Sequence, residues 1–116
     1  MCGISGLISK GGQPDETRVR RINQAIAHRG PDADRTWTRG RAVLGHRRLS
    51  IIDLSPEAHQ PLLNEDGTIG VVVNGEIYNF AELREDLVAR GHVFRSHSDS
   101  EVVVHLYEEH GVDCVA

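Results

Sequence analysis

The chain has 116 residues, enough for one ordinary domain and too few for two well-filled cores. Its 13 Lys and Arg residues against 17 Asp and Glu residues give a formal charge of −4, and no basic stripe is visible, so binding to DNA or RNA through the phosphate backbone is disfavoured. No apolar stretch approaches the roughly 20 residues that a membrane span needs, and no basic segment followed by an apolar run marks a secretory signal, so a cytoplasmic protein is expected.

The first half of the sequence predicts a strand, a helix and two further strands. Residues 2–8 alternate small and apolar side chains, as a strand does, and their glycines suggest that another backbone or a ligand passes close by. A helix is expected to begin after Asp15, its candidate N-cap, and to end at Gly30, which suits the left-handed position after a helix. Short strands are then predicted, followed by a mixed extended run; these segments are 35–38, 42–44 and 45–52.

The second half predicts a hairpin and two helices. Asp66-Gly67 is a signal for a tight turn, and the β-branched segment 69–73 predicts a buried strand. Two capping-box patterns, at residues 79–82 and 98–101, predict helices that close at Gly91 and Gly111. A short strand is expected between them, at 92–95. The order of elements indicates a layered mixture of helices and strands.

The two cysteines are expected to have different roles. They are too few for a disulfide framework, and they form no C-x-x-C pair. Cys114 lies among apolar residues and is expected to behave as a small hydrophobe. Cys2 would become the first residue if Met1 were removed, and its α-amine, with a pKa of about 7.7–8.0, could then take the thiol proton. The alternative is an ordinary cysteine near a frayed terminus.

Other residues could bind and polarise a substrate. Asn74 and Gly75 follow the predicted buried strand and could supply two hydrogen-bond donors to an oxyanion. Arg48 sits in an apolar strand, where a substrate carboxylate would satisfy it, and only one of Arg47 and Arg48 can face inward. Asp99, working with Glu76, could accept an ammonium group. The structural alternatives are a polar turn, a surface arginine and a helix cap.

The histidines and acidic residues near the end of the sequence do not predict a metal site. Their spacing matches none of the usual helical metal motifs, so they are expected to be solvated or capping residues. These residues are His92, His97, Asp99, Glu101 and His105.

Five segments, in order across nearly the whole chain, resemble the class II glutamine amidotransferase domain, and most closely that of the glutamine-hydrolysing asparagine synthetases. They are residues 1–6, 28–32, 45–53, 74–79 and 98–101. The resemblance implies an α+β fold, the N-terminal nucleophile hydrolase αββα sandwich of antiparallel sheets, incomplete at the C-terminus. Residues 1–116 would be the N-terminal part of the glutaminase domain of a longer polypeptide, with the synthetase domain absent.

The same resemblance implies a site for L-glutamine. Cys2 would be the nucleophile, forming a thioester that water cleaves to glutamate, and Asn74 and Gly75 would hold the oxyanion. The substrate-binding residues implied are Arg48, Leu49 and Ile52 for the α-carboxylate, and Glu76 and Asp99 for the α-amino group.

The ammonia released is expected to reach a C-terminal synthetase domain that uses ATP and Mg²⁺ to convert aspartate to asparagine. No cofactor or metal is expected in residues 1–116, and a homodimer is left open. Three alternatives stay open: a binding module without catalysis, an amidotransferase with another acceptor, and a histidine-rich metal-binding domain.

Overall fold

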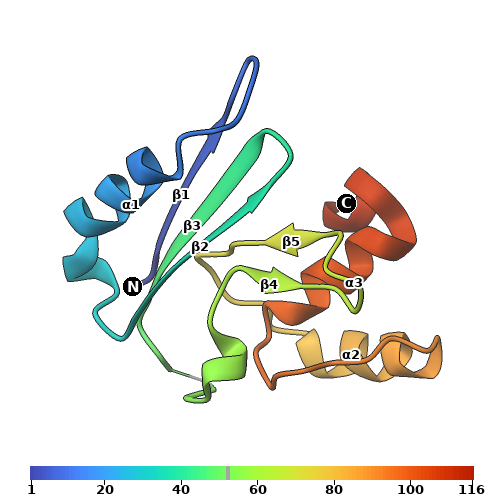
Figure 1. Cartoon of the computed structure of the whole chain (residues 1–116). Coiled ribbons are helices and arrows are strands. Elements are labelled where there is room, and N and C mark those ends of the chain that lie inside the picture. The colour runs from blue at the N-terminus through green and yellow to red at the C-terminus, as the bar shows by residue number, and fades with distance from the viewer. Residues whose placement is uncertain (52) are drawn as a thin grey trace. The chain divides into compact units, whose positions relative to one another are not determined.

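The computed structural model of the chain describes residues 1–51 and 53–116 and combines helices with antiparallel strands, an α+β composition (Figure 1). The described residues fall into two compact units. Unit 1 contains residues 1–51, 59–61 and 72–74, and unit 2 contains residues 53–58, 62–71 and 75–116. Within the described residues, no helix is both long enough and apolar enough to cross a membrane.

Unit 1 is built on a three-stranded antiparallel sheet in the order β1-β3-β2. Its strands are β1 (Gly3–Ile8), β2 (Ala33–Arg39) and β3 (Ala42–Arg48). All three predicted strands are therefore confirmed, and residues 45–48 of the extended run predicted at 45–52 form the second half of β3, while residues 49–51 lie outside the strand and residue 52 lies outside the described residues. The register pairs Gly3 with Arg47 on one side of β3 and Ala33 with Arg48 on the other.

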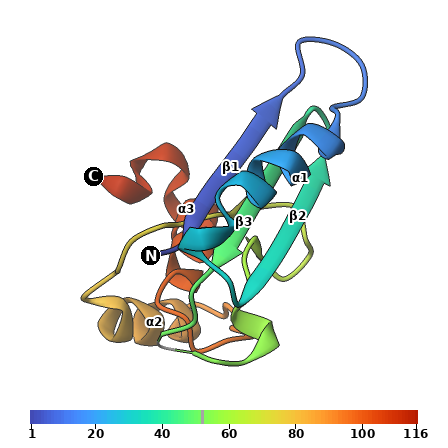
Figure 2. The same ribbon diagram turned by 90° about the vertical axis from the view of Figure 1, so that its left-hand side faces the viewer.

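Helix α1 (Glu16–Ala25) covers one face of this sheet, the face turned toward the viewer in Figure 2. Asp15 caps it as predicted, since its carboxylate accepts a hydrogen bond of 3.0 Å from the backbone N–H of Thr17. The helix presents Val19 and Asn23 to the sheet, and both are fully buried. Asn23 accepts a hydrogen bond from Ser5 and donates one to Asp34, at 2.6 and 2.7 Å, so its buried amide is satisfied on both sides.

Gly30 does not take the left-handed conformation that the sequence predicted. A 3₁₀ turn, Ala27–Arg29, follows α1, and Gly30 after it has φ −146°, an extended value open to any residue. Glycine is needed there for space: a Cβ would lie 2.4 Å from the carbonyl carbon of Arg47 and 2.6 Å from the backbone nitrogen of Arg48. The chain therefore crosses the end of β3 at a distance that only glycine allows.

Unit 2 holds a short hairpin and two helices. Strands β4 (Leu62–Leu63) and β5 (Gly70–Val71) pair antiparallel, with Gly67 at φ +71° in the connection, and helices α2 (Phe80–Ala89) and α3 (Glu101–His110) follow. Short 3₁₀ turns lie at Pro56–Ala58 and Gly111–Val115. Buried apolar side chains form the core, namely Ala58, Leu62, Leu87, Val102 and Val104. Gly91 and Gly111 have positive φ after the two helices, as predicted.

Three predictions in this unit are wrong. The predicted strand at 69–73 shortens to the two residues of β5. Neither predicted capping box forms: Asn79, the N-cap of α2, makes no side-chain capping hydrogen bond, and α3 has Ser100 as its N-cap, while the predicted cap Ser98 accepts from the backbone N–H of Ser100 at 3.3 Å. Residues 92–95 form no strand, because side chains bind the backbone N–H groups that a strand would offer: Glu65 accepts from Val93 at 2.8 Å and Glu101 accepts from Arg95 at 2.7 Å.

Candidate functional site

Cys2 precedes β1 and is held against the residue that follows β3. Its Sγ accepts a hydrogen bond from the backbone N–H of Leu49, at 3.4 Å, and donates one to the carbonyl oxygen of the same residue, at 3.6 Å. The Arg29 guanidinium also binds the Cys2 carbonyl oxygen at 3.0 Å. The thiol is half-buried and has a defined position, as a nucleophile requires.

Arg48 is the buried arginine of the pair at the end of β3, with 6% of its surface exposed. The neighbouring Arg47 makes an ion pair of 3.1 Å with Asp34 and donates to the carbonyl oxygen of Gly30 at 2.9 Å. Successive side chains of a strand point to opposite faces, so only one arginine of the pair is buried, as the sequence predicted. Continuing the register of Gly3 with Arg47 by one residue places Cys2 opposite Arg48.

Asn74 is exposed, but the residue before it is firmly held within unit 1. The backbone N–H of Val73 donates to the Gln60 side chain at 2.5 Å, and the Val73 carbonyl oxygen accepts from His46 Nε2 at 3.2 Å. This contact requires the proton on Nε2. Burial lowers the pKa of His46, with help from the positive charges of Arg48 and His59. The imidazole is therefore a neutral donor that fixes the backbone leading into Asn74.

In unit 2, Asp99 lies beside the segment that carries Glu76. Asp99 is buried, and its Oδ2 accepts a hydrogen bond of 2.7 Å from the backbone N–H of Ile77. The carboxylate thus fixes the chain directly after Glu76, whose own side chain is exposed, as is Gly75. Asp99 therefore contacts the residue that follows Glu76 in the chain, and the ammonium-binding role of the two acidic residues stays a prediction. Ile52, the remaining predicted contact, lies outside the described residues.

Comparison with known proteins identifies the family. Residues 1–116 match the model of the glutamine amidotransferase domain. The chain belongs to this family. It is similar to a probable glutamine-hydrolyzing asparagine synthetase of Dictyostelium discoideum (46% identity over 118 residues) and to glutamine-hydrolyzing asparagine synthetases of Arabidopsis thaliana (48% over 117) and Bacillus subtilis strain 168 (43% over 119).

Each of these alignments covers 99% of the chain but only 21%, 20% and 16% of the respective relative. The amidotransferase chain therefore spans about a fifth of the length of these relatives.

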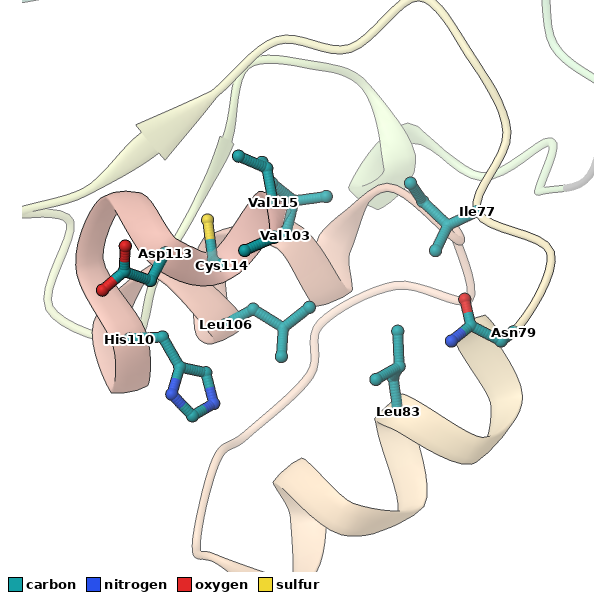
Figure 3. A pocket seen from close by; sticks show the side chains of 10 residues that line it. Ile77, Asn79, Leu83, Val103, Leu106, His110, Asp113, Cys114 and Val115 are labelled. Atoms are coloured by element: carbon teal, nitrogen blue, oxygen red, sulfur yellow. The ribbon is translucent and has the colours of Figure 1, made fainter.

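A pocket of about 600 Å³ lies in unit 2 of the amidotransferase chain, where Leu83 of α2 faces Val103 and Leu106 of α3 (Figure 3). Cys114 also lines it, half-buried among apolar side chains, which agrees with the expectation of a small hydrophobe. None of the site residues predicted from the sequence lines this pocket. The pocket therefore adds nothing to the glutamine site that the resemblance implies.

Sequence reasoning missed two residues that position the predicted site. His46 and Gln60 hold Val73, yet neither was proposed as functional. His46 lies inside one of the five segments that carry the family resemblance, which is a signal that could have drawn attention to it. Gln60 follows a polar loop and carries no comparable signal.

Proposed function

We propose that this amidotransferase chain is the glutaminase part of a glutamine-hydrolysing asparagine synthetase, and that Cys2 hydrolyses L-glutamine to glutamate and ammonia. The observation that carries the proposal is the position of the Cys2 thiol. The thiol is hydrogen-bonded to Leu49 and lies opposite the buried Arg48. The family is that of the glutamine amidotransferase domain, and the relatives are named glutamine-hydrolyzing asparagine synthetases.

The covalent step starts once Met1, 71% exposed, is removed. The freed α-amine of Cys2 takes the thiol proton, and the thiolate attacks the γ-carboxamide carbon of glutamine. The side chain of Asn74 and the backbone N–H of Gly75 stabilise the oxyanion; removing one such donor typically costs about 2.7–4 kcal/mol of barrier. The protonated amine then passes its proton to the leaving nitrogen, the C–N bond breaks, and ammonia departs. Water cleaves the remaining thioester to glutamate and restores the thiol.

Opposite charges hold the two ends of the substrate in this proposal. The Arg48 guanidinium pairs with the α-carboxylate, assisted by the backbone of Leu49 and Ile52, because a guanidinium matches a carboxylate with two parallel hydrogen bonds. The carboxylates of Glu76 and Asp99 accept the α-ammonium group. The bond from Ile77 to Asp99 supports this arrangement, since it fixes one carboxylate next to the segment that carries the other.

The rest of the proposal concerns the longer protein. We propose that residues 1–116 are the N-terminal part of an N-terminal nucleophile hydrolase sandwich, and that the ammonia serves a C-terminal synthetase domain. There ATP and Mg²⁺ would activate aspartate for conversion to asparagine. L-glutamine and that domain are the proposed partners of this chain.

The test uses the longer protein and two variants of it. Cys2→Ala should abolish glutamate release from glutamine while leaving asparagine synthesis from free ammonia intact. Cys114→Ala, the matched cysteine control, should keep both activities. Intact-mass measurement should show that Met1 is absent. Unchanged glutamate release in Cys2→Ala, or full retention of Met1 in active protein, would overturn the mechanism. Glutamine binding without any turnover in the wild type would instead identify a non-catalytic binding module.

A further inference from the structure

Four side chains from three separate segments of unit 2 converge on one point. Glu65 comes from the β4–β5 connection, His92 follows α2, and His105 and Glu108 lie on α3. One nitrogen or oxygen atom of each lies within 4.8 Å of the corresponding atoms of the other three. These residues, here called the His–Glu cluster, are separated by up to 43 positions in the sequence, so no local motif could reveal them.

The distances inside the His–Glu cluster fit a tetrahedral metal ion. Nδ1 of His92 lies 3.4 Å from Glu65 Oε1 and 3.4 Å from Glu108 Oε2. Nδ1 of His105 lies 3.4 Å from Glu65 Oε1 and 3.8 Å from Glu108 Oε2. Nitrogen and oxygen ligands bind Zn²⁺ at about 2.0–2.1 Å, which separates ligand atoms of a regular tetrahedron by about 3.3–3.4 Å.

His105 provides an independent indication that a ligand belongs there. Its side chain is completely buried, and neither ring nitrogen makes a hydrogen bond with any described residue. Nδ1 points toward Glu65 and Glu108 at distances too long for good hydrogen bonds. A buried imidazole with no hydrogen bond is rare in folded proteins, and a metal ion at the centre of the cluster would satisfy this nitrogen.

The outer ring nitrogens face carboxylates, as they do in most histidine–metal sites. Nε2 of His92 is hydrogen-bonded to Glu109 Oε1 at 2.7 Å, and Nε2 of His105 lies 3.7 Å from Glu101 Oε1. The hydrogen bond to Glu109 fixes the tautomer of His92 that leaves its Nδ1 free to bind a metal. The two glutamate ligands are also oriented from outside, since Glu65 accepts from the backbone of Val93 at 2.8 Å and Asn64 donates to Glu108 at 3.1 Å.

We propose that the His–Glu cluster binds one divalent transition-metal ion of the Zn²⁺ type. The four ligands are Nδ1 of each histidine and one carboxylate oxygen of each glutamate. Two carboxylates and two neutral imidazoles balance the charge of a dication. The ion joins the β4–β5 connection, the segment after α2, and α3, so its role is to stabilise unit 2. This departs from the sequence-based expectation of no metal, and it does not depend on the proposed glutaminase function.

The test is a metal titration of chelator-treated protein, with no glutamine present. Isothermal calorimetry with ZnCl₂ should give one site per chain, and Zn²⁺ should raise the thermal unfolding temperature. Co²⁺ in place of Zn²⁺ should give the intense visible absorption of a tetrahedral complex. Glu108→Gln, an exposed and nearly isosteric change, should lower the Zn²⁺ affinity at least tenfold, and Glu109→Gln should lower it about tenfold through His92.

Two variants control for charge and for histidine content. Glu85→Gln removes an exposed carboxylate from α2, and His97→Gln removes an exposed histidine of the same unit; both should bind Zn²⁺ as the wild type does. Absence of a stoichiometric site, or equal Zn²⁺ affinity in Glu108→Gln and Glu85→Gln, would overturn the proposal. Binding with the spectrum of an octahedral Co²⁺ complex would also overturn the four-ligand site.

Discussion

Replacing Gly30 by alanine should displace the end of β3 that carries Arg48. The added Cβ would lie 2.4 and 2.5 Å from the carbonyl carbon and oxygen of Arg47, and 2.6 Å from the nitrogen of Arg48. Ordinary contact begins near 3.5 Å, so the two backbones must separate by about 1 Å. Because all three neighbours are backbone atoms, no side-chain rotation can relieve the clash.

Such overpacking should destabilise the protein by about 2–3 kcal/mol, which lowers the midpoint of urea unfolding by about 1–2 M. In the longer protein, moving Arg48 by this distance should also lower kcat/KM for glutamine by about 10²-fold, the typical cost of a 1 Å misplacement. Gly11→Ala is the matched control, because a Cβ there meets nothing within 4 Å. If the urea midpoints of the two variants agree within error, the steric reasoning is refuted.

Three further changes test the packing and electrostatics of the two units. Leu87→Ala, in the core of unit 2, should cost about 2–5 kcal/mol of unfolding free energy in urea. Glu16→Gln should cost about 1 kcal/mol at neutral pH, because the Glu16 carboxylate accepts hydrogen bonds from Thr36 and Thr38 at 2.7 and 2.9 Å. Those hydroxyl hydrogen bonds lower the Glu16 pKa, so this contribution should be present above about pH 4.5 and disappear as the pH falls below it. Burial lowers the pKa of His46, so its folded form resists protonation; the stability it contributes should be present above about pH 6.5 and lost as the pH falls, and His46→Gln should remove this dependence.

For each of these three variants, one measured result would contradict the prediction. A loss below 1 kcal/mol in Leu87→Ala would mean that the core of unit 2 is not well packed. A Glu16→Gln variant that stays less stable than the wild type at pH 3 would show that charge and hydrogen bonding at Glu16 are not the cause. Parallel stability curves for wild type and His46→Gln between pH 8 and pH 5.5 would show that His46 is not buried in its neutral form.

Signals that act over a few residues predicted the fold well. Asp15 caps α1 because a carboxylate reaches the N–H two residues on, whatever the rest of the chain does. Gly67 and Gly111 adopt positive φ for an equally local reason. The alternation of small and apolar residues over 2–8 predicted a strand correctly, and the strand predicted at 42–44 is part of β3.

The predictions of local structure were wrong where a contact with another segment of the chain decided the conformation. Glu101 looked like the last residue of a capping box, but its carboxylate binds the N–H groups of Arg95 and Ser96 instead. The same bonds prevent 92–95 from pairing as a strand. Gly30 was interpreted through its own conformation, whereas the approach of β3 determines its identity. None of these partners can be read from spacing along the chain.

The candidate site, like the fold, could be predicted only in part from the sequence. The structure places Cys2 in contact with Leu49, next to Arg48, and Asp99 in contact with the residue after Glu76, while the catalytic and binding roles assigned to these residues stay predictions. The positioning by His46 and the convergence of Glu65 and Glu108 were missed. These depend on chain folding that brings residues together from 27 to 43 positions apart.

The two hydrogen bonds that hold the backbone of Val73 have a consequence for hydrogen exchange. Val73 lies outside any strand, yet Gln60 binds its N–H and His46 binds its carbonyl oxygen. Val71, two residues earlier, belongs to β5 and to unit 2, whereas Val73 belongs to unit 1. The amide protons of these two valines should therefore exchange with solvent at separate rates, each governed by the opening of its own unit.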